Sequence, residues 1–135
     1  MPVFNDAKLL AKYLKKAADA TLAESLITTQ SELGNTSVSP YRDGRFRSSW
    51  FAAEGNASGA MAEKGANSPN TDAMNLRVDS NREYHLTNSL PYAQALCIEG
   101  RVVSKSPNWF REFRASRVPK IQQAAAEAVK REYDL

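Results

Sequence analysis

The chain has 135 residues, of which 42% are hydrophobic and 24% charged, and a formal net charge of +3. This length fits one compact domain that buries a core without disulfide or metal support, and the composition excludes a wholly disordered chain. The single cysteine excludes an intramolecular disulfide, and no apolar run approaches the ~20 residues of a membrane span. The mild net charge falls short of a densely basic, histone-like protein.

The charges are unevenly distributed along the chain. Residues 51–100 carry six acidic and three basic side chains, whereas residues 101–135 carry eight basic and four acidic ones. Opposite charges on one small protein suit head-to-tail contacts between copies, because such contacts need complementary surfaces. An ordinary solvated surface is the simpler explanation of the same pattern.

Residues 3–32 are predicted to form one long helix. Apolar or small residues recur every three or four positions, and four charged residues lie on the opposite face. Asn5 or Asp6 can cap the start, and Gly34-Asn35 can end the helix. The apolar stripe is Val3, Ala7, Leu10, Leu14, Ala17 and Thr21, with Leu22 and Leu26 beside it, and the charged face is Lys8, Lys12, Lys15 and Asp19.

The middle of the chain is predicted to hold a strand and a long loop. Residues 45–53 alternate as a strand does, and a short helix leading into a strand fits them equally well. Residues 54–72 are rich in Gly, Ala, Asn and Ser, which predicts a flexible loop or an irregular hairpin tip. A long mobile loop in a compact domain is usually functional, and here we expect it to order against a partner.

The second half is predicted to hold a hairpin and a helical end. Residues 73–80 and 82–88 alternate and predict a β-hairpin over 73–88, turning at Ser80-Asn81. Residues 91–98 predict a short helix ended by Gly100, and residues 107–133 a helical region that Pro119 kinks or breaks. The sum is a single α+β domain over 1–135: a small antiparallel sheet packed against a long N-terminal helix and a C-terminal helical region.

Side chains typical of catalysis are sparse. His85 is the only histidine and Cys97 the only cysteine, so no local cluster predicts a metal site, a cofactor or a nucleophile. We therefore expect no enzyme, no cofactor and no metal. A stronger signal is the interleaving of Arg42, Arg45 and Arg47 with aromatic residues, because arginines can hold phosphates while rings stack on bases. The competing interpretation places Phe46 and Trp50, four residues apart, together in the core.

Three segments, in this order, resemble the head–tail joining or tail-completion family of lambda-like tailed bacteriophages. The first is SPYRDGRFRSSW at 39–50, matched by Asp43, Gly44, Arg45, Phe46, Arg47, Ser48 and Trp50. The second is LTNSLPYAQALCIEG at 86–100, matched by Asn88, Pro91, Tyr92, Ala93, Glu99 and Gly100. The third is SPNWFREF at 106–113, a proline-containing entry into a C-terminal helix. The adjacency of Glu99 and Gly100 and the Gly/Ala-rich insert at 54–72 depart from the family pattern.

The resemblance implies a virion component of the head–tail junction or tail end, a homo-oligomeric ring, expected to be a hexamer, around the DNA channel. Its partners would be copies of itself, the adjacent connector or neck and tail-tube proteins, and passing genomic DNA, without membrane contact. The resemblance gives structural roles to Asp43, Gly44, Phe46, Trp50, Asn88, Pro91, Tyr92 and Gly100, and leaves Arg42, Arg45, Arg47 and Glu99 for subunit contacts or the DNA channel. Two alternatives remain open, a small basic nucleic-acid-binding module and, less favoured, a small enzyme.

Overall fold

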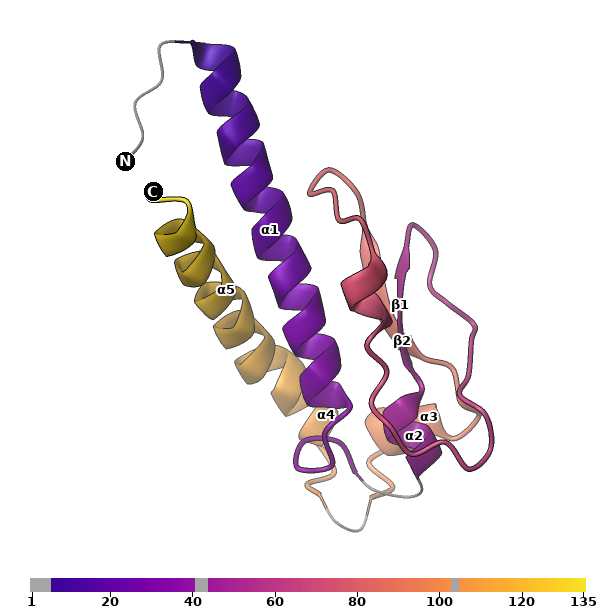
Figure 1. Cartoon of the computed structure of the whole chain (residues 1–135). Helices are drawn as coiled ribbons and strands as arrows, with labels where there is room; N and C mark the ends of the chain where they lie inside the picture. The colour runs from indigo at the N-terminus through magenta and orange to yellow at the C-terminus, as the bar shows by residue number, and fades with distance from the viewer. Residues whose placement is uncertain (1–5, 41–43, 103–104) are drawn as a thin grey trace.

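A computed structural model describes residues 6–40, 44–102 and 105–135. Arg42 and Asp43, two of the predicted site residues, lie outside these ranges. The described chain is α+β, as predicted, with long helices toward both ends and a two-stranded antiparallel sheet between them. Figure 1 shows α1 (Ala7–Leu33) at the centre, with α5 (Val118–Glu132) along one side and the sheet on the other.

The long N-terminal helix, α1, begins directly after its capping residue. Asp6 is the N-cap residue of α1, and its carboxylate accepts a hydrogen bond from the backbone N–H of Lys8 at 2.7 Å. The helix ends at Leu33, one residue beyond the prediction, and Gly34 follows as its C-cap. The predicted apolar stripe is buried only in part, since Ala17 is 7% exposed and Leu14 is 46% exposed.

The sheet pairs different strands from those predicted. A short helix, α2 (Gly44–Ser48), leads into β1 (Trp50–Glu54), which fits one of the two alternatives for residues 45–53. Strand β1 pairs with β2 (Tyr84–Asn88), so that Trp50 lies opposite Asn88 and Ala52 opposite Leu86.

The predicted hairpin over 73–88 is therefore wrong in its first strand. Residues 72–75 form a 3₁₀ helix, η1 (Asp72–Asn75), and the alternating Met74 is 65% exposed instead of facing a core. The turn around Ser80 exists, closed by a hydrogen bond from Arg82 N to Asp79 O, but it does not join two paired strands. Alternating apolar spacing predicted a paired strand at 73–80. In the structure the N–H of Ala52, at the edge of β1, donates instead to the Asp72 carboxylate.

The C-terminal helical region is continuous through three segments of two helix types. It runs from α4 (Trp109–Glu112) through a π-helical segment, η2 (Phe113–Arg117), into α5. Pro119 sits in the first turn of α5, where its missing N–H is tolerated. The π segment just before it lets the helix continue past the predicted break. Between β2 and this region lies α3 (Ala93–Cys97), shorter than the predicted 91–98.

The main core lies at the end of α1 where the two sides of the molecule meet. Its members come from α1, from the segments around the sheet and from the C-terminal helical region, and all are at most 7% exposed. They are Leu33, Phe46, Trp50, Leu90, Ala93, Leu96, Trp109, Phe113 and Ile121. The predicted burial of Phe46 and Trp50 is confirmed.

Candidate interaction site

The three family-like segments meet at one aromatic side chain. Phe46, from the first segment, is fully buried, and its ring centroid lies 5.8 Å from that of Trp50. It also lies 6.3 Å from the ring of Tyr92, in the second segment, and 6.4 Å from that of Trp109, in the third. Aromatic rings at these separations gain attraction beyond their buried area. Segments far apart in the sequence thus form one packed unit.

Hydrogen bonds fix this unit where segments cross. The Asn88 side chain donates from Nδ2 to the Phe46 carbonyl at 2.9 Å, and its Oδ1 accepts from the N–H of Leu90. Asn88 therefore ties α2 to the corner after β2. The indole N–H of Trp109 donates to the Leu96 carbonyl at 2.8 Å, which ties α4 to α3.

Two glycines of the motifs are required by close contacts. A Cβ on Gly44 would lie 2.2 Å from Oδ1 of Asn67, so α2 can begin there only because the loop side chain meets bare backbone. Gly100 has φ +68°, and a Cβ there would lie 2.9 Å from the carbonyl oxygen of Pro107. Gly100 thus lets the chain turn from α3 toward the third segment.

The two described arginines of the first segment have partners inside the chain. Arg45 donates from Nε to the Ala62 carbonyl at 2.7 Å. Arg47 donates to the side chain and carbonyl of Asn67 at 2.9 and 2.8 Å, and to the carbonyl of Gly34. Both side chains therefore hold residues 55–71, the loop between β1 and η1, against α2. These contacts weaken the expectation that Arg45 and Arg47 face DNA or a neighbouring subunit.

The 55–71 loop, one residue shorter at each end than the predicted mobile segment 54–72, has neither helix nor strand but is anchored at several points. Ser58 accepts hydrogen bonds at its carbonyl from the hydroxyls of Thr87 and Ser89. Ala62 N donates to the Ser49 hydroxyl, and Ser68 N to the Ser48 hydroxyl. Its predicted mobility stays a prediction, whereas its position over α2 and β2 follows from these bonds.

A groove opens on the other side of the packed unit, between β2, α3 and α4. It has a volume of about 390 Å³ and is lined mostly by apolar atoms, including those of Leu86, Ala93 and Ile98. Trp50 lies in its wall, stacked on Phe110 at 5.7 Å. Trp50 Nε1 is the only buried side-chain nitrogen or oxygen without a hydrogen-bond partner among the described residues.

A smaller hollow of about 240 Å³ shares Cys97, Ile98 and Phe110 with the groove and adds Arg111 and Arg114. The guanidinium of Arg114 lies 5.8 Å from the Phe110 ring centroid, a cation–π distance. Together the two hollows, here called the α3–α4 groove, have an apolar floor, the buried Trp50 indole in the wall and a cationic rim. Such a surface suits an apolar side chain accompanied by a carboxylate.

Glu99, Pro91 and Tyr92 complete the set of predicted site residues. Glu99 is exposed and its carboxylate lies 3.4 Å from the Arg101 guanidinium. Pro91 is exposed and precedes α3, while Tyr92 is half-buried against Phe46. Of the predicted contact residues within the described ranges, Glu99 is exposed, whereas Arg45 and Arg47 are half-buried.

Cys97, which lines the groove, and His85, which lies outside it, have defined surroundings. Burial raises the pKa of the Cys97 thiol to about 12, so the reactive thiolate is scarce at neutral pH. His85 uses Nε2 to contact the Gly55 carbonyl at 2.9 Å, a bond that closes the end of the sheet. Within the described ranges, no group of three His, Cys, Asp or Glu side chains could hold a metal ion.

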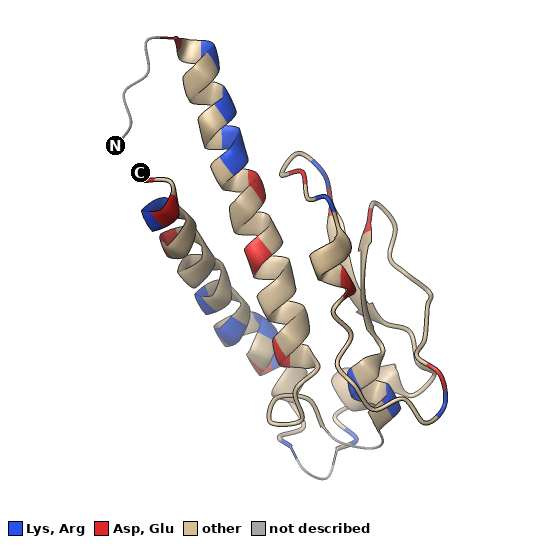
Figure 2. Ribbon diagram, viewed as in Figure 1, with Lys and Arg blue, Asp and Glu red and all other residues tan. Residues whose placement is uncertain are grey.

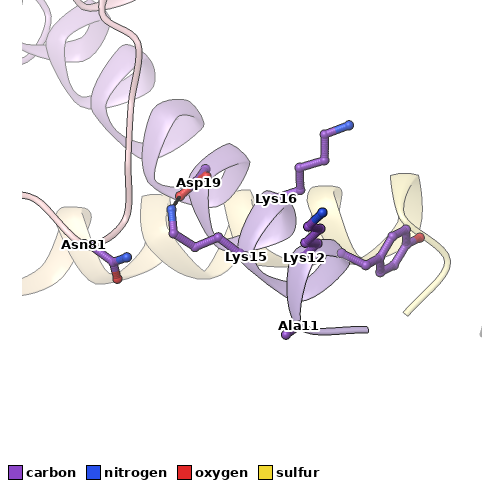
Figure 3. A pocket seen from close by; sticks show the side chains of 7 residues that line it. Ala11, Lys12, Lys15, Lys16, Asp19 and Asn81 are labelled. Atoms are coloured by element: carbon purple, nitrogen blue, oxygen red, sulfur yellow. Dashed lines mark hydrogen bonds and ion pairs between the residues drawn. The ribbon is translucent and has the colours of Figure 1, made fainter. Parts of the chain in front are cut away.

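A second pocket, of about 680 Å³, lies beside the N-terminal half of α1. In Figure 3, Lys15 reaches Asp19, while Lys12 and Lys16 extend away from this pair. Lys15 Nζ lies 2.6 Å from Asp19 and 2.7 Å from Asp79. The hydrogen bond from Lys15, followed by one from the Ser80 N–H, lowers the pKa of Asp19 to about 2.

The side chain that joins the two sides of the molecule, Gln30, is not among the predicted site residues. Gln30 is 1% exposed and donates from Nε2 to the Trp50 carbonyl at 3.0 Å and to Asp72 at 2.5 Å. Its Oε1 accepts from Ala73 N, and Asp72 in turn accepts from Ala52 N. These bonds cover the edge of β1 that faces away from β2. A single glutamine in a helix carries no sequence signal for such a role.

Comparison of the chain with protein-family models, curated proteins and solved structures found no match. None of the helices in the described ranges has the length and apolar character needed to cross a membrane.

Proposed function

We propose that this protein is a structural component of a tailed-phage virion that joins tail to head as a ring around the DNA channel. Its position would be the neck, the tail-completion site or the tail terminus. Its partners would be copies of itself, in an expected hexamer, and the adjoining connector and tail-tube proteins. The observation that carries the proposal is the resemblance of three ordered segments, supported by their convergence on Phe46.

The convergence matters because it gives the resembling residues a shared physical task. The described parts of the segments at 39–50, 86–100 and 106–113 build one packed unit, in which Asn88, Trp109 and Gly100 fix the crossings. A ring subunit needs such a unit, since each copy must present its two contact surfaces at a constant angle for the ring to close. The apolar α3–α4 groove and the anchored 55–71 loop supply surfaces of different chemistry.

The experiment removes the coding sequence from the phage or prophage genome that carries it and images the products. We expect DNA-filled heads and free tails that do not join, and we expect purified protein added to the lysate to restore joined particles. A matched control adds the Phe46→Ala variant, which should not restore joining because its packed unit is disrupted. Normal joined particles without the gene would overturn the proposal.

A nucleic-acid-binding module remains the second candidate, for a different reason from the one the sequence suggested. Lys8, Lys12 and Lys16 are exposed along one face of α1, four residues apart, and none has an ion-pair partner among the described residues. Figure 2 shows these basic positions in the N-terminal half of α1. Like charges at this spacing repel, so an anionic strand would relieve them. The test is duplex binding whose affinity falls steeply with salt and is lost in the triple Lys→Gln variant.

A further inference from the structure

The α3–α4 groove contains polar and charged groups that have no partner within the described residues of one copy. Trp50 is 3% exposed, yet its indole N–H has no acceptor in the described chain, whereas the comparable N–H of Trp109 is bonded to a carbonyl. A buried donor without a partner is unfavourable and rare, so it points to an acceptor that arrives from outside. Ile98, at the mouth of the groove, is 67% exposed, and Arg111 and Arg114 stand at its rim without carboxylate partners among the described residues.

The same chain carries a segment of matching chemistry on the 55–71 loop. Met61 is 46% exposed, and Glu63, two residues later, is exposed and has no ion pair in the described ranges. The bonds of Ser58 to Thr87 and of Ala62 to Ser49 hold this part of the loop in place. Met61 and Glu63 therefore combine an adaptable apolar side chain with a carboxylate, the pair that the groove lacks.

The loop segment does not line the groove of its own copy. Side chains alternate along a strand, so Trp50, Leu86 and Asn88 share the groove face, as their register requires. Thr87, whose side chain alternates away from that face although the residue also lines the groove, is bonded to Ser58 of the loop. Met61 does not line the groove of its own copy, and a second copy can supply it.

We propose that Met61 and Glu63 of one copy dock in the α3–α4 groove of the next copy. The Met61 side chain packs against Ile98 and Phe110, the Glu63 carboxylate pairs with Arg111 or Arg114, and a loop carbonyl accepts from Trp50 Nε1. This contact uses two different surfaces, so its repetition builds a ring or a filament instead of a twofold dimer. The inference rests on the proposed ring function and names the contact that would build the ring.

Charge complementarity selects this occupant over the exposed leucines of α1. Leu9 and Leu14 are 55% and 46% exposed, but they stand among Lys8, Lys12 and Lys15. A basic surface would be repelled by the arginine rim. The 51–100 stretch, with six acidic and three basic residues, supplies the opposite charge that residues 101–135 lack.

Disulfide trapping tests the contact directly. In a Cys97→Ala background, Met61→Cys is combined with Ile98→Cys, and the purified protein is oxidised near its assembly concentration. We expect a ladder of disulfide-linked oligomers on a denaturing gel, ending at the subunit number of the ring. The matched control combines Ile98→Cys with Gln123→Cys, an exposed position on α5, and should give little ladder.

A charge exchange tests the same contact without cysteines. Glu63→Arg and Arg111→Glu/Arg114→Glu should each weaken self-association by about tenfold or more, and mixing the two variants should restore it, because each supplies one intact charge set. Glu127→Arg, on an exposed face of α5, is the control and should associate like the parent. Circular dichroism establishes that every variant folds.

The two possible failures are distinct. Assembly of the parent protein without a 61–98 ladder and without charge rescue would overturn this contact and leave the joining function standing. A parent protein that stays monomeric at every concentration would also overturn the contact, since free copies would then not dock on one another. The gene-removal experiment decides the joining function independently of either result.

Discussion

The two sides of the molecule are held together in different ways. The α1–α5 pair packs mainly small or aliphatic side chains, namely Ala17, Ile121, Ala125 and Val129, with a ring contact and a hydroxyl-to-carbonyl bond between Tyr13 and Tyr133 at the end of α5. Helix α1 extends past the end of α5 in Figure 1. The unit built by the three motif segments is instead locked by aromatic rings around Phe46 and by side-chain bonds to backbone carbonyls. Burial of large rings stabilises more per residue, so we expect the motif unit to be the more stable part of the domain.

The contrast suggests a division of roles. The motif unit holds the α3–α4 groove and the 55–71 loop at fixed positions, whereas the free turns of α1 expose Leu9 and a row of lysines. Gln30 connects the two sides, because it is on α1 but bonds to β1 and η1. Substitutions in the two regions should therefore differ in how much they lower stability. Four tests, from the largest expected effect to the smallest, examine this difference.

Phe46→Ala should be the most damaging single change. It empties a fully buried site touched by three other rings, which costs about 3–5 kcal/mol of unfolding free energy. Val129→Ala, in the helical pair, removes less buried surface and should cost about 2 kcal/mol. Both values are measured by urea denaturation. Equal losses at the two sites would break the proposed contrast between the regions.

Gln30→Ala should separate the two sides of the molecule. It leaves the N–H of Ala73 without its acceptor and the Trp50 carbonyl without a donor, which costs about 2–3 kcal/mol. Gln122→Ala, at an exposed position on α5, is the matched control and should change stability by less than about 0.5 kcal/mol. Similar denaturation midpoints for the two variants would show that the buried clamp contributes nothing.

Gly100→Ala tests the turn between α3 and the third segment. The residue has φ +68°, and its new Cβ would meet Pro107, so we expect a loss of about 1–2 kcal/mol. Gly59→Ala, in the loop, faces open space and should leave the thermal midpoint nearly unchanged. An unchanged midpoint for Gly100→Ala would mean that the backbone relaxes there without cost.

The Lys15–Asp19 pair predicts a small acid sensitivity. The folded-state pKa of Asp19, about 2, is below its ordinary value of 3.8, so ionised Asp19 contributes stability above pH 4 that is lost as the pH falls toward 2. Asp19→Asn should remove part of this loss, flattening thermal stability between pH 4 and pH 2. Glu24→Gln, on the same helix at an exposed position, should leave the slope unchanged. A parental slope in Asp19→Asn would contradict the assignment.

Local patterns predicted the elements whose signals lie within the element itself. Asp6 as the cap, the helix over most of 3–32, and the buried Phe46 and Trp50 follow from capping chemistry and spacing. The strand that pairs with β2 could not be predicted in this way, because residues 73–80 alternate in the same manner whether or not they pair as a strand. The Gln30–Asp72 hydrogen bond, which holds residue 72 in place instead, joins residues far apart in the sequence. The partners of Arg45 and Arg47 depend on where an irregular loop returns, which spacing cannot predict.

The most direct test of a ring-forming virion component is the mass of the purified protein by light scattering across concentration, with negative-stain images of the same sample. We predict a defined oligomer that appears as rings, with a hole of at least about 20 Å, on the order of the width of a DNA duplex. A strict monomer that binds duplex DNA with a steep salt dependence would contradict this account and favour a nucleic-acid-binding module.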